Sequence, residues 1–278
     1  MAVRMLAGCG AQQQVLQIQA SLARAEPLRL VGERRAIVAC LLRRSSLGGA
    51  PQMSTSSLDI FFILRASAKN DHGVTGASAG SRWAGQVGFP GGHAHDGEGD
   101  HEAVVRECFE EVGLSLDRPG AYRFLGCVAE RKVSTSLVVA CRVYEQVLPE
   151  IPRHVQAEEV AACAWAPLAE LCSDDCAQPL YWSRLRRTAS TCWDGMPSVM
   201  LPIMDICCAE GVAAENVQGQ FVLWGLTLRI VSDLLCTSGL RSSPIQLQRE
   251  ASNFEPEDKS DHLHPLAPSS KGRQRSCL

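Results

Sequence analysis

The stretch from Gly92 to Leu114 reads GHAHDGEGDHEAVVRECFEEVGL, and its acidic residues decide how the whole chain is interpreted. Glu110 and Glu111 follow Glu107 by three and four residues. Residues at these spacings share one face of a helix, where like charges repel each other. Cations that neutralise such a face would stabilise it, and Mg²⁺ and Mn²⁺ prefer oxygen ligands. The spacing therefore predicts a cation-binding helix over 101–112.

Further residues stand at fixed distances from these glutamates. Five residues separate Gly92 from Glu98, seven separate Glu98 from Arg106, and Gly113 follows the last glutamate after one residue. The pattern resembles the Nudix box, the signature of hydrolases that cleave nucleoside diphosphates linked to another moiety. Cys108 takes a place usually held by an aliphatic residue, and a buried cysteine behaves as a small hydrophobe. The alternative interpretation is a solvated acidic helix face.

The resemblance implies a role for each residue of the box. The metal ligands that it implies for Mg²⁺ or Mn²⁺ are Glu107, Glu111, Glu110 and the backbone carbonyl of Gly91. The side chains that it implies for the catalytic step are Glu107, Glu110, Arg106 and Glu98. Arg106 would pair with nearby glutamates and hold their conformations. Glu98 would support the loop and the metal site, and a supporting role is left open for Glu110 as well.

Several neighbouring residues are further candidates. We expect His93, His95 and His101 to be solvated, because the carboxylates already supply hard ligands. The catalytic base is left open: Glu158 or Glu159, on a loop before an apolar stretch, could reach the site. A weaker candidate is Glu130, and the adjacent Arg131 and Lys132 would either hold phosphates or form an exposed turn.

The segment before the box bears on the substrate. Gly85 to Gly92 reads GQVGFPGG and resembles the G-x-V-x-F-P-G-G element of the coenzyme A diphosphatase branch. Phe62 to Ser67 resembles that branch's L-L-T-x-R-S element only in part, because the threonine is absent and Ala66 lies between Arg65 and Ser67. The resemblance implies cleavage of coenzyme A or acyl-CoA to 3′,5′-ADP and 4′-phosphopantetheine. The alternatives are hydrolysis of ADP-ribose or a dinucleotide cofactor, and a non-catalytic nucleotide-binding module.

Composition limits the partners of the chain. Of its 278 residues, 46% are hydrophobic and 21% are charged, as in a soluble globular protein. A net charge of -3 argues against nucleic acid as a partner. The 13 cysteines include no C-x-x-C pair and lie mostly in apolar runs, which predicts reduced thiols and an intracellular, reducing compartment. No apolar run approaches the roughly 20 residues that span a bilayer, so we expect no membrane partner. The sequence does not specify an oligomeric state.

Strand and helix patterns alternate along the chain. Strands are expected at 36–42, 59–64, 86–89, 123–129, 136–144, 158–165 and 199–203. Loops are expected at 45–57 and 69–81, and helices at 12–24, 101–112 and 221–235. Asp100 is the expected N-cap of the box helix, and Gly113 suits its C-terminal cap. Strands interleaved with helices predict a mixed sheet covered by helices, and the resemblance sharpens this α/β class to the Nudix-type α/β/α sandwich.

Composition also suggests a division of the chain. The expected parts are a variable N-terminal segment at 1–30, a Nudix hydrolase domain at 31–240 and a disordered tail at 241–278, where Ser, Pro and mixed charge dominate. Residues 1–25 contain two arginines and no acidic residue, which is a weak match to a mitochondrial presequence. The terminal Ser276-Cys277-Leu278 resembles the S-K-L peroxisomal address with its cation replaced. Peroxisome and mitochondrion are therefore the compartments to consider.

Overall fold

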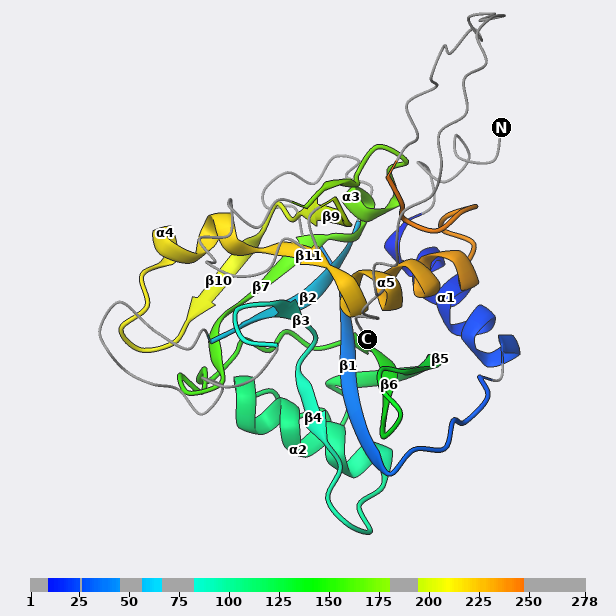
Figure 1. Cartoon of the computed structure of the whole chain (residues 1–278), viewed down its shortest axis with the longest axis horizontal. Helices are drawn as coiled ribbons and strands as arrows, with labels where there is room; N and C mark the ends of the chain where they lie inside the picture. The colour runs from blue at the N-terminus through cyan, green and yellow to red at the C-terminus, as the bar shows by residue number, and fades with distance from the viewer. Residues whose placement is uncertain (1–9, 26, 46–56, 67–82, 181–194, 248–278) are drawn as a thin grey trace, which may run out of the picture. The chain divides into compact units, whose positions relative to one another are not determined.

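The computed structural model of the chain describes residues 10–25, 27–45, 57–66, 83–180 and 195–247, which are coloured in Figure 1. Most of the loop expected at 45–57 and all of the loop expected at 69–81 lie outside these residues. So do residues 1–9 of the expected presequence and the terminal Ser276-Cys277-Leu278.

An eight-stranded mixed sheet forms the centre of the fold. In spatial order its main strands are β10 (Met204–Cys208), β7 (Val160–Pro167), β2 (Leu58–Arg65), β1 (Arg34–Arg44), β6 (Leu137–Gln146) and β5 (Tyr122–Lys132). Strands β1 and β6 are parallel, whereas the other neighbours on this path are antiparallel. The expected strands at 36–42, 59–64 and 123–129 fall within these elements, and those at 136–144 and 158–165 overlap them but start one and two residues too early.

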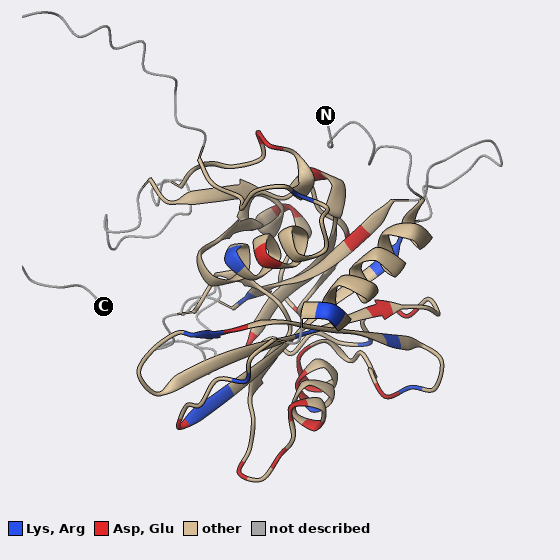
Figure 2. Cartoon of the chain, turned by 90° about the vertical axis from the view of Figure 1, so that its right-hand side faces the viewer, with Lys and Arg blue, Asp and Glu red and all other residues tan. Residues whose placement is uncertain are grey.

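Helices cover both faces of the sheet (Figures 1 and 2). Helix α2 (Asp100–Val112) packs on one face, and helices α1 (Ala11–Ala25) and α5 (Gly225–Thr237) pack on the other. Alternation along β1 explains the division, because successive side chains of a strand point to opposite faces. Ile37, Ala39 and Leu41 join the core around α2, while Cys40 and Leu42 join the core around α1 and α5. This confirms the α/β/α sandwich.

The site lies where strands β1 and β2 separate. The two strands pair directly only at one end, where Leu42 lies opposite Ile60. Beyond that point they separate, and two short strands fill the space: β3 (Val87–Gly88) pairs with β2, and β4 (Gly91–His93) pairs with β1. The turn at Pro90 between them is held by an N–H···O bond of 2.8 Å from Ala39 to the Pro90 carbonyl. The glycine-rich turn is thereby inserted into the sheet beside α2.

The remaining elements are short. They are α3 (Leu168–Cys172), β8 (Gln178–Pro179), β9 (Pro197–Met200), α4 (Ala214–Val217), η5 (Gln218–Gln220) and β11 (Val222–Trp224). Strands β8, β9 and β11 form a second sheet. The expected helix at 221–235 is wrong at its start, because Val222–Trp224 pairs with β9 as a strand and the helix begins at Gly225.

Both ends of the described chain pack more closely than composition suggested. Val15, Ile18 and Leu22 of α1 are buried in the main core, so part of the segment expected to be variable is a structural helix. After α5, Arg241 is 7% exposed and donates to the carbonyl oxygen of Leu171 at 3.2 Å. Ile245 donates its backbone N–H to Ser232 Oγ at 2.9 Å. The expected start of disorder at 241 is therefore wrong, since ordered packing continues through this segment.

Two further observations concern composition. No helix in the described ranges is long and apolar enough to cross a membrane. The ten cysteines among these residues are free thiols, and Cys40, Cys108, Cys141 and Cys163 are buried. Burial raises the pKa of these four thiols, which favours their protonated, unreactive form.

Candidate active site

Helix α2 carries the carboxylates of the box, and local bonds close both of its ends. The backbone N–H of Gly99 donates to Glu102 Oε2 at 2.9 Å, half of a capping box. Gly113 ends the helix with φ 66°, a left-handed conformation that glycine adopts without strain. Asp100 is the first helical residue, not the expected N-cap, because its carboxylate binds the Arg35 guanidinium at 2.7 Å.

The glycine turn and α2 approach each other closely. Glu111 is 1% exposed, and its Oε2 accepts a hydrogen bond of 2.8 Å from the backbone N–H of Gly91. Gly91 has φ 142°, and a Cβ there would clash with the Ile37 carbonyl oxygen. A Cβ at Gly92 would lie 2.5 Å from the carboxylate of Glu107. A side chain at Gly91 would push the turn away from β1, and one at Gly92 would displace the Glu107 carboxylate.

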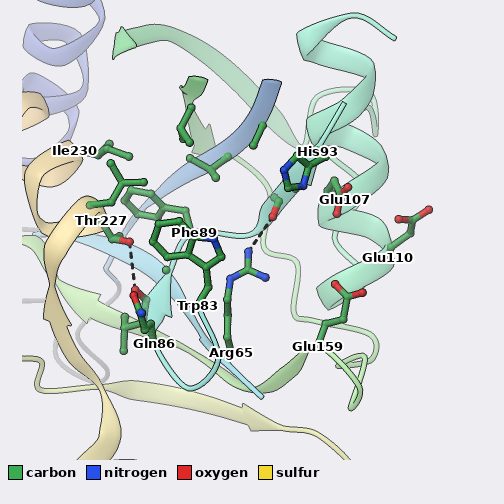
Figure 3. A pocket seen from close by; sticks show the side chains of 18 of the residues that line it. Arg65, Trp83, Gln86, Phe89, His93, Glu107, Glu110, Glu159, Thr227 and Ile230 are labelled. Atoms are coloured by element: carbon green, nitrogen blue, oxygen red, sulfur yellow. Dashed lines mark hydrogen bonds between the residues drawn. The ribbon is translucent and has the colours of Figure 1, made fainter. Parts of the chain in front are cut away.

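Arg65 lies between these two elements. Its Nη2 donates to the Gly91 carbonyl oxygen at 2.9 Å, and its Nη1 is 3.3 Å from Glu111 Oε1 (Figure 3). That carboxylate oxygen is buried and accepts no hydrogen bond. A cationic side chain therefore sits beside two of the groups that the resemblance assigns to the metal. In the sequence, Arg65 belongs only to the partial match to the L-L-T-x-R-S element, and no spacing rule connects it to Glu111.

Arg106 connects the other carboxylates of the box. Its Nε and Nη2 donate to the two carboxylate oxygens of Glu98, each at 2.9 Å. Its Nη1 donates to Glu107 at 2.9 Å and to Glu110 at 3.1 Å, and Nη2 also reaches the His93 carbonyl oxygen at 3.0 Å. A planar guanidinium holds several oxygens in fixed directions. One side chain thus sets the positions of three glutamates and of β4.

Burial and charge set the protonation of these carboxylates. Burial raises the pKa of Glu111 to about 7, and it also raises the pKa of Glu107, because an anion loses hydration inside the protein. Hydrogen bonds from Arg106 lower the pKa of Glu98 to about 2. Glu98 is therefore an anion that orients Arg106, whereas burial disfavours the anionic forms of Glu107 and Glu111.

A cavity of about 650 Å³ opens in front of these groups. Glu107, Glu110 and Glu159 line one end of it, and Thr227 and Ile230 of α5 line the opposite end, with Phe89 and Trp83 between them (Figure 3). The residues of α5 that line the cavity were not predicted from the sequence. An apolar helix far along the chain carries no local signal that it faces this cavity.

The structure separates the candidates for the catalytic base. Glu159 lines the cavity, whereas Glu158 is exposed outside it. Glu130 binds Arg35, so the site does not include it. Arg131 binds Asp233 of α5 with its Nε at 2.9 Å and does not line the cavity.

The three histidines near the box lie in different places. His93 and His95 line the cavity, and burial lowers the pKa of His93, which favours its neutral form. His101 points elsewhere, with its Nδ1 3.2 Å from the Tyr144 hydroxyl. All three side chains are exposed, as expected for solvated histidines.

The donor set fits a divalent cation. In the described part of the chain, no three His, Cys, Asp or Glu side chains are already gathered as a metal cluster. The reason is visible in the contacts: Arg106 binds Glu107 and Glu110, and Arg65 lies beside Glu111. Glu111 Oε1 is buried without a hydrogen bond, and burial raises the pKa of both inner glutamates, so an additional cation would stabilise their anionic forms. Hard oxygen donors of this kind suit Mg²⁺ or Mn²⁺.

Comparison with known proteins shows what the chain is similar to. Residues 61–188 match the model of the NUDIX domain. A solved MutT NUDIX hydrolase from Burkholderia pseudomallei is similar at 25% identity over 54% of this chain and 91% of that chain, with a TM-score of 0.32. An Ap4A hydrolase from C. elegans, solved as a binary complex, is similar at 16% identity over 48% and 80% of the two chains, with a TM-score of 0.34.

The NUDIX domain of NrtR from Shewanella oneidensis, solved with ADP ribose, is similar at 18% identity. It covers 55% of this chain and 84% of that chain, with a TM-score of 0.33. No curated protein sequence matches the chain. The matched residues 61–188 are thus similar to a Nudix domain, and the box pattern on α2 lies within them.

Proposed function

We propose that this chain cleaves the diphosphate bond of a nucleoside diphosphate derivative with the help of Mg²⁺ or Mn²⁺, and that coenzyme A or acyl-CoA is its substrate. The observation that carries the proposal is that Glu107, Glu110 and Gly91 line one end of a substrate-sized cavity, while the buried Glu111 binds the Gly91 N–H directly behind it. The choice of coenzyme A rests on the resemblance of Gly85 to Gly92, the segment that forms the turn beside this end.

Glu107, Glu111 and the Gly91 carbonyl would hold the cation, with Glu110 contributing from its more exposed position. When bound, the cation would neutralise charge on the diphosphate and lower the pKa of a water molecule. Arg106 keeps Glu107 and Glu110 turned towards the cavity, and Glu98 in turn holds Arg106. Loss of such outer contacts weakens metal sites because the ligands lose their fixed orientation.

Glu159 is our choice for the catalytic base, since it lines the cavity whereas Glu158 does not. It would accept a proton from the attacking water as the new phosphorus–oxygen bond forms. The bridging oxygen–phosphorus bond breaks in the same displacement. With coenzyme A, one water is consumed and the products are 3′,5′-ADP and 4′-phosphopantetheine.

A substrate screen on the purified full-length protein tests this function. Coenzyme A, acyl-CoA, ADP-ribose, NADH and diadenosine polyphosphates would be compared with Mg²⁺ and with Mn²⁺, and products would be separated by chromatography. We expect the highest kcat/KM for the coenzyme A species. A clear preference for ADP-ribose or a dinucleotide would reject the substrate choice and keep the reaction class. No cleavage of any of them would favour the nucleotide-binding module.

A further inference from the structure

The cavity has a second functional end, formed by helix α5 outside the residues that match the NUDIX model. Leu226, Thr227 and Ile230 of this helix line it, at spacings that put them on one face. Figure 3 shows Thr227 and Ile230 across the cavity from Glu107 and Glu110. A substrate held by its diphosphate at the acidic end would therefore extend its other moiety towards α5.

The side chains around this end are mostly aliphatic. Val38, Val87, Leu137 and Val139 from the sheet line the cavity together with the α5 residues. The charged side chains that line the cavity belong to the strand and helix positions around the box and to Glu159, and none comes from α5. A charged group buried against aliphatic side chains would lose hydration without gaining a partner. This end thus suits an uncharged, apolar group.

Helix α5 is held firmly enough to act as a wall. The Thr227 hydroxyl donates to the Val87 carbonyl oxygen at 3.2 Å, which ties the start of α5 to the strand leading into the glycine turn. Leu228, Val231 and Leu234 are buried in the core beneath the helix. This bond and the packing beneath α5 place its cavity-facing side chains opposite the acidic end.

We propose that Leu226 and Ile230 are specificity-determining residues, and that the α5 end binds an uncharged aliphatic substituent carried on the phosphate opposite the nucleoside. The inference rests on the proposed function, in which the acidic end holds the diphosphate. Burial of each added methylene in this end favours binding by up to about fourfold. Substrates with a longer aliphatic substituent are therefore preferred over polar ones of similar size.

Alkyl esters of ADP, with methyl, butyl and octyl groups on the terminal phosphate, test this independently of coenzyme A. For the full-length protein, kcat/KM is expected to rise from methyl to octyl, mainly through a lower KM. Leu226→Asn should flatten this rise, so that kcat/KM differs little between the methyl and octyl esters. Arg229→Asn is the matched control, because Arg229 is exposed on the same helix and does not line the cavity. It should behave as the unmodified protein.

Ile230→Val provides a second variant if Leu226→Asn folds poorly, since it removes one methylene from a side chain that is 4% exposed. It should raise the KM for the octyl ester by about two- to fourfold and hardly alter that for the methyl ester. A flat chain-length dependence in the unmodified protein, or an unaltered dependence in both variants, would overturn the inference.

Failure of the proposed function is distinguishable from failure of the inference. If alkyl esters are cleaved with the expected dependence and coenzyme A is not, the substrate choice fails and the α5 assignment stands. If nothing is cleaved, calorimetric binding of octyl and methyl ADP replaces turnover as the readout. Tighter binding of the octyl ester, lost in Leu226→Asn, would then support the inference, and equal binding would reject it.

Discussion

Helices α2 and α5 form opposite walls of one cavity and are held in place by different combinations of forces. Helix α2 buries Val104, Cys108 and Val112 in a core, and polar contacts add to this packing: the Gly99 and Gly113 ends, the Arg106 network and the bond from Gly91 to Glu111. Helix α5 is fixed mainly by apolar side chains packed beneath it. Charged groups must be aimed to within a hydrogen-bond length to do chemistry, and directional bonds provide this. A recognition wall needs shape and polarity, which non-directional packing supplies.

This contrast is tested most strongly at Glu107. Glu107→Gln should lower turnover by about a thousandfold, because the charge stabilisation that a metal site provides is worth several kcal/mol. The free energy of unfolding should change little, since the amide fills the same space and burial already penalises the charged form. Steady-state kinetics and urea unfolding would be measured on the same preparation. Turnover near that of the unmodified protein would refute the role of Glu107.

Leu234 of α5 provides the opposite case. Leu234→Ala removes a side chain that is 1% exposed, and such truncations cost about 2–5 kcal/mol. Urea unfolding should show this loss, while kcat of the folded fraction stays close to normal because Leu234 does not line the cavity. An unchanged stability with a sharply lower kcat would mean that packing under α5 affects the chemistry directly. That result would contradict the separate roles of α2 and α5.

Arg106 tests whether orientation by itself matters on the α2 side. Arg106→Ala should weaken Mn²⁺ binding and turnover by about 10–100-fold, the usual cost of removing a contact that orients metal ligands. Arg106→Lys should recover only part of this, because a lysine cannot bind Glu98 with two parallel bonds. Mn²⁺ affinity would be followed by electron paramagnetic resonance, and full activity in the alanine variant would count against the network.

The smallest expected effect concerns the start of α2. Arg35 hydrogen bonds lower the pKa of Asp100 below its ordinary value of 3.8. A lowered folded-state pKa means that the pair stabilises the fold above the unfolded pKa and that this contribution is lost as pH falls through the folded pKa. Asp100→Asn should cost about 1 kcal/mol or less at pH 7 and flatten the decline in stability below about pH 4. An unaltered pH profile in urea unfolding would contradict the assignment.

The sequence predicted the core of the fold because its patterns are local. Alternation and apolar runs placed the five long strands from β1 to β7, and the box spacing placed α2. Short elements such as β4 and β11 were missed, since two or three residues carry no periodic signal. The start of α5 was misplaced for the same reason: Val222–Trp224 has the composition of the helix that follows and is a strand only because β9 lies beside it.

The site divides in the same way. The chain by itself determined that Glu107, Glu110, Glu111 and Arg106 share one helix face, because helical geometry follows from spacing along the chain. Only the tertiary structure decided that Arg65 reaches Glu111, that Glu159 and not Glu158 faces the cavity, and that α5 closes its far end. These contacts join segments far apart in sequence, and their geometry depends on how the sheet separates between β1 and β2. No local pattern encodes that separation, so it exists only in the folded chain.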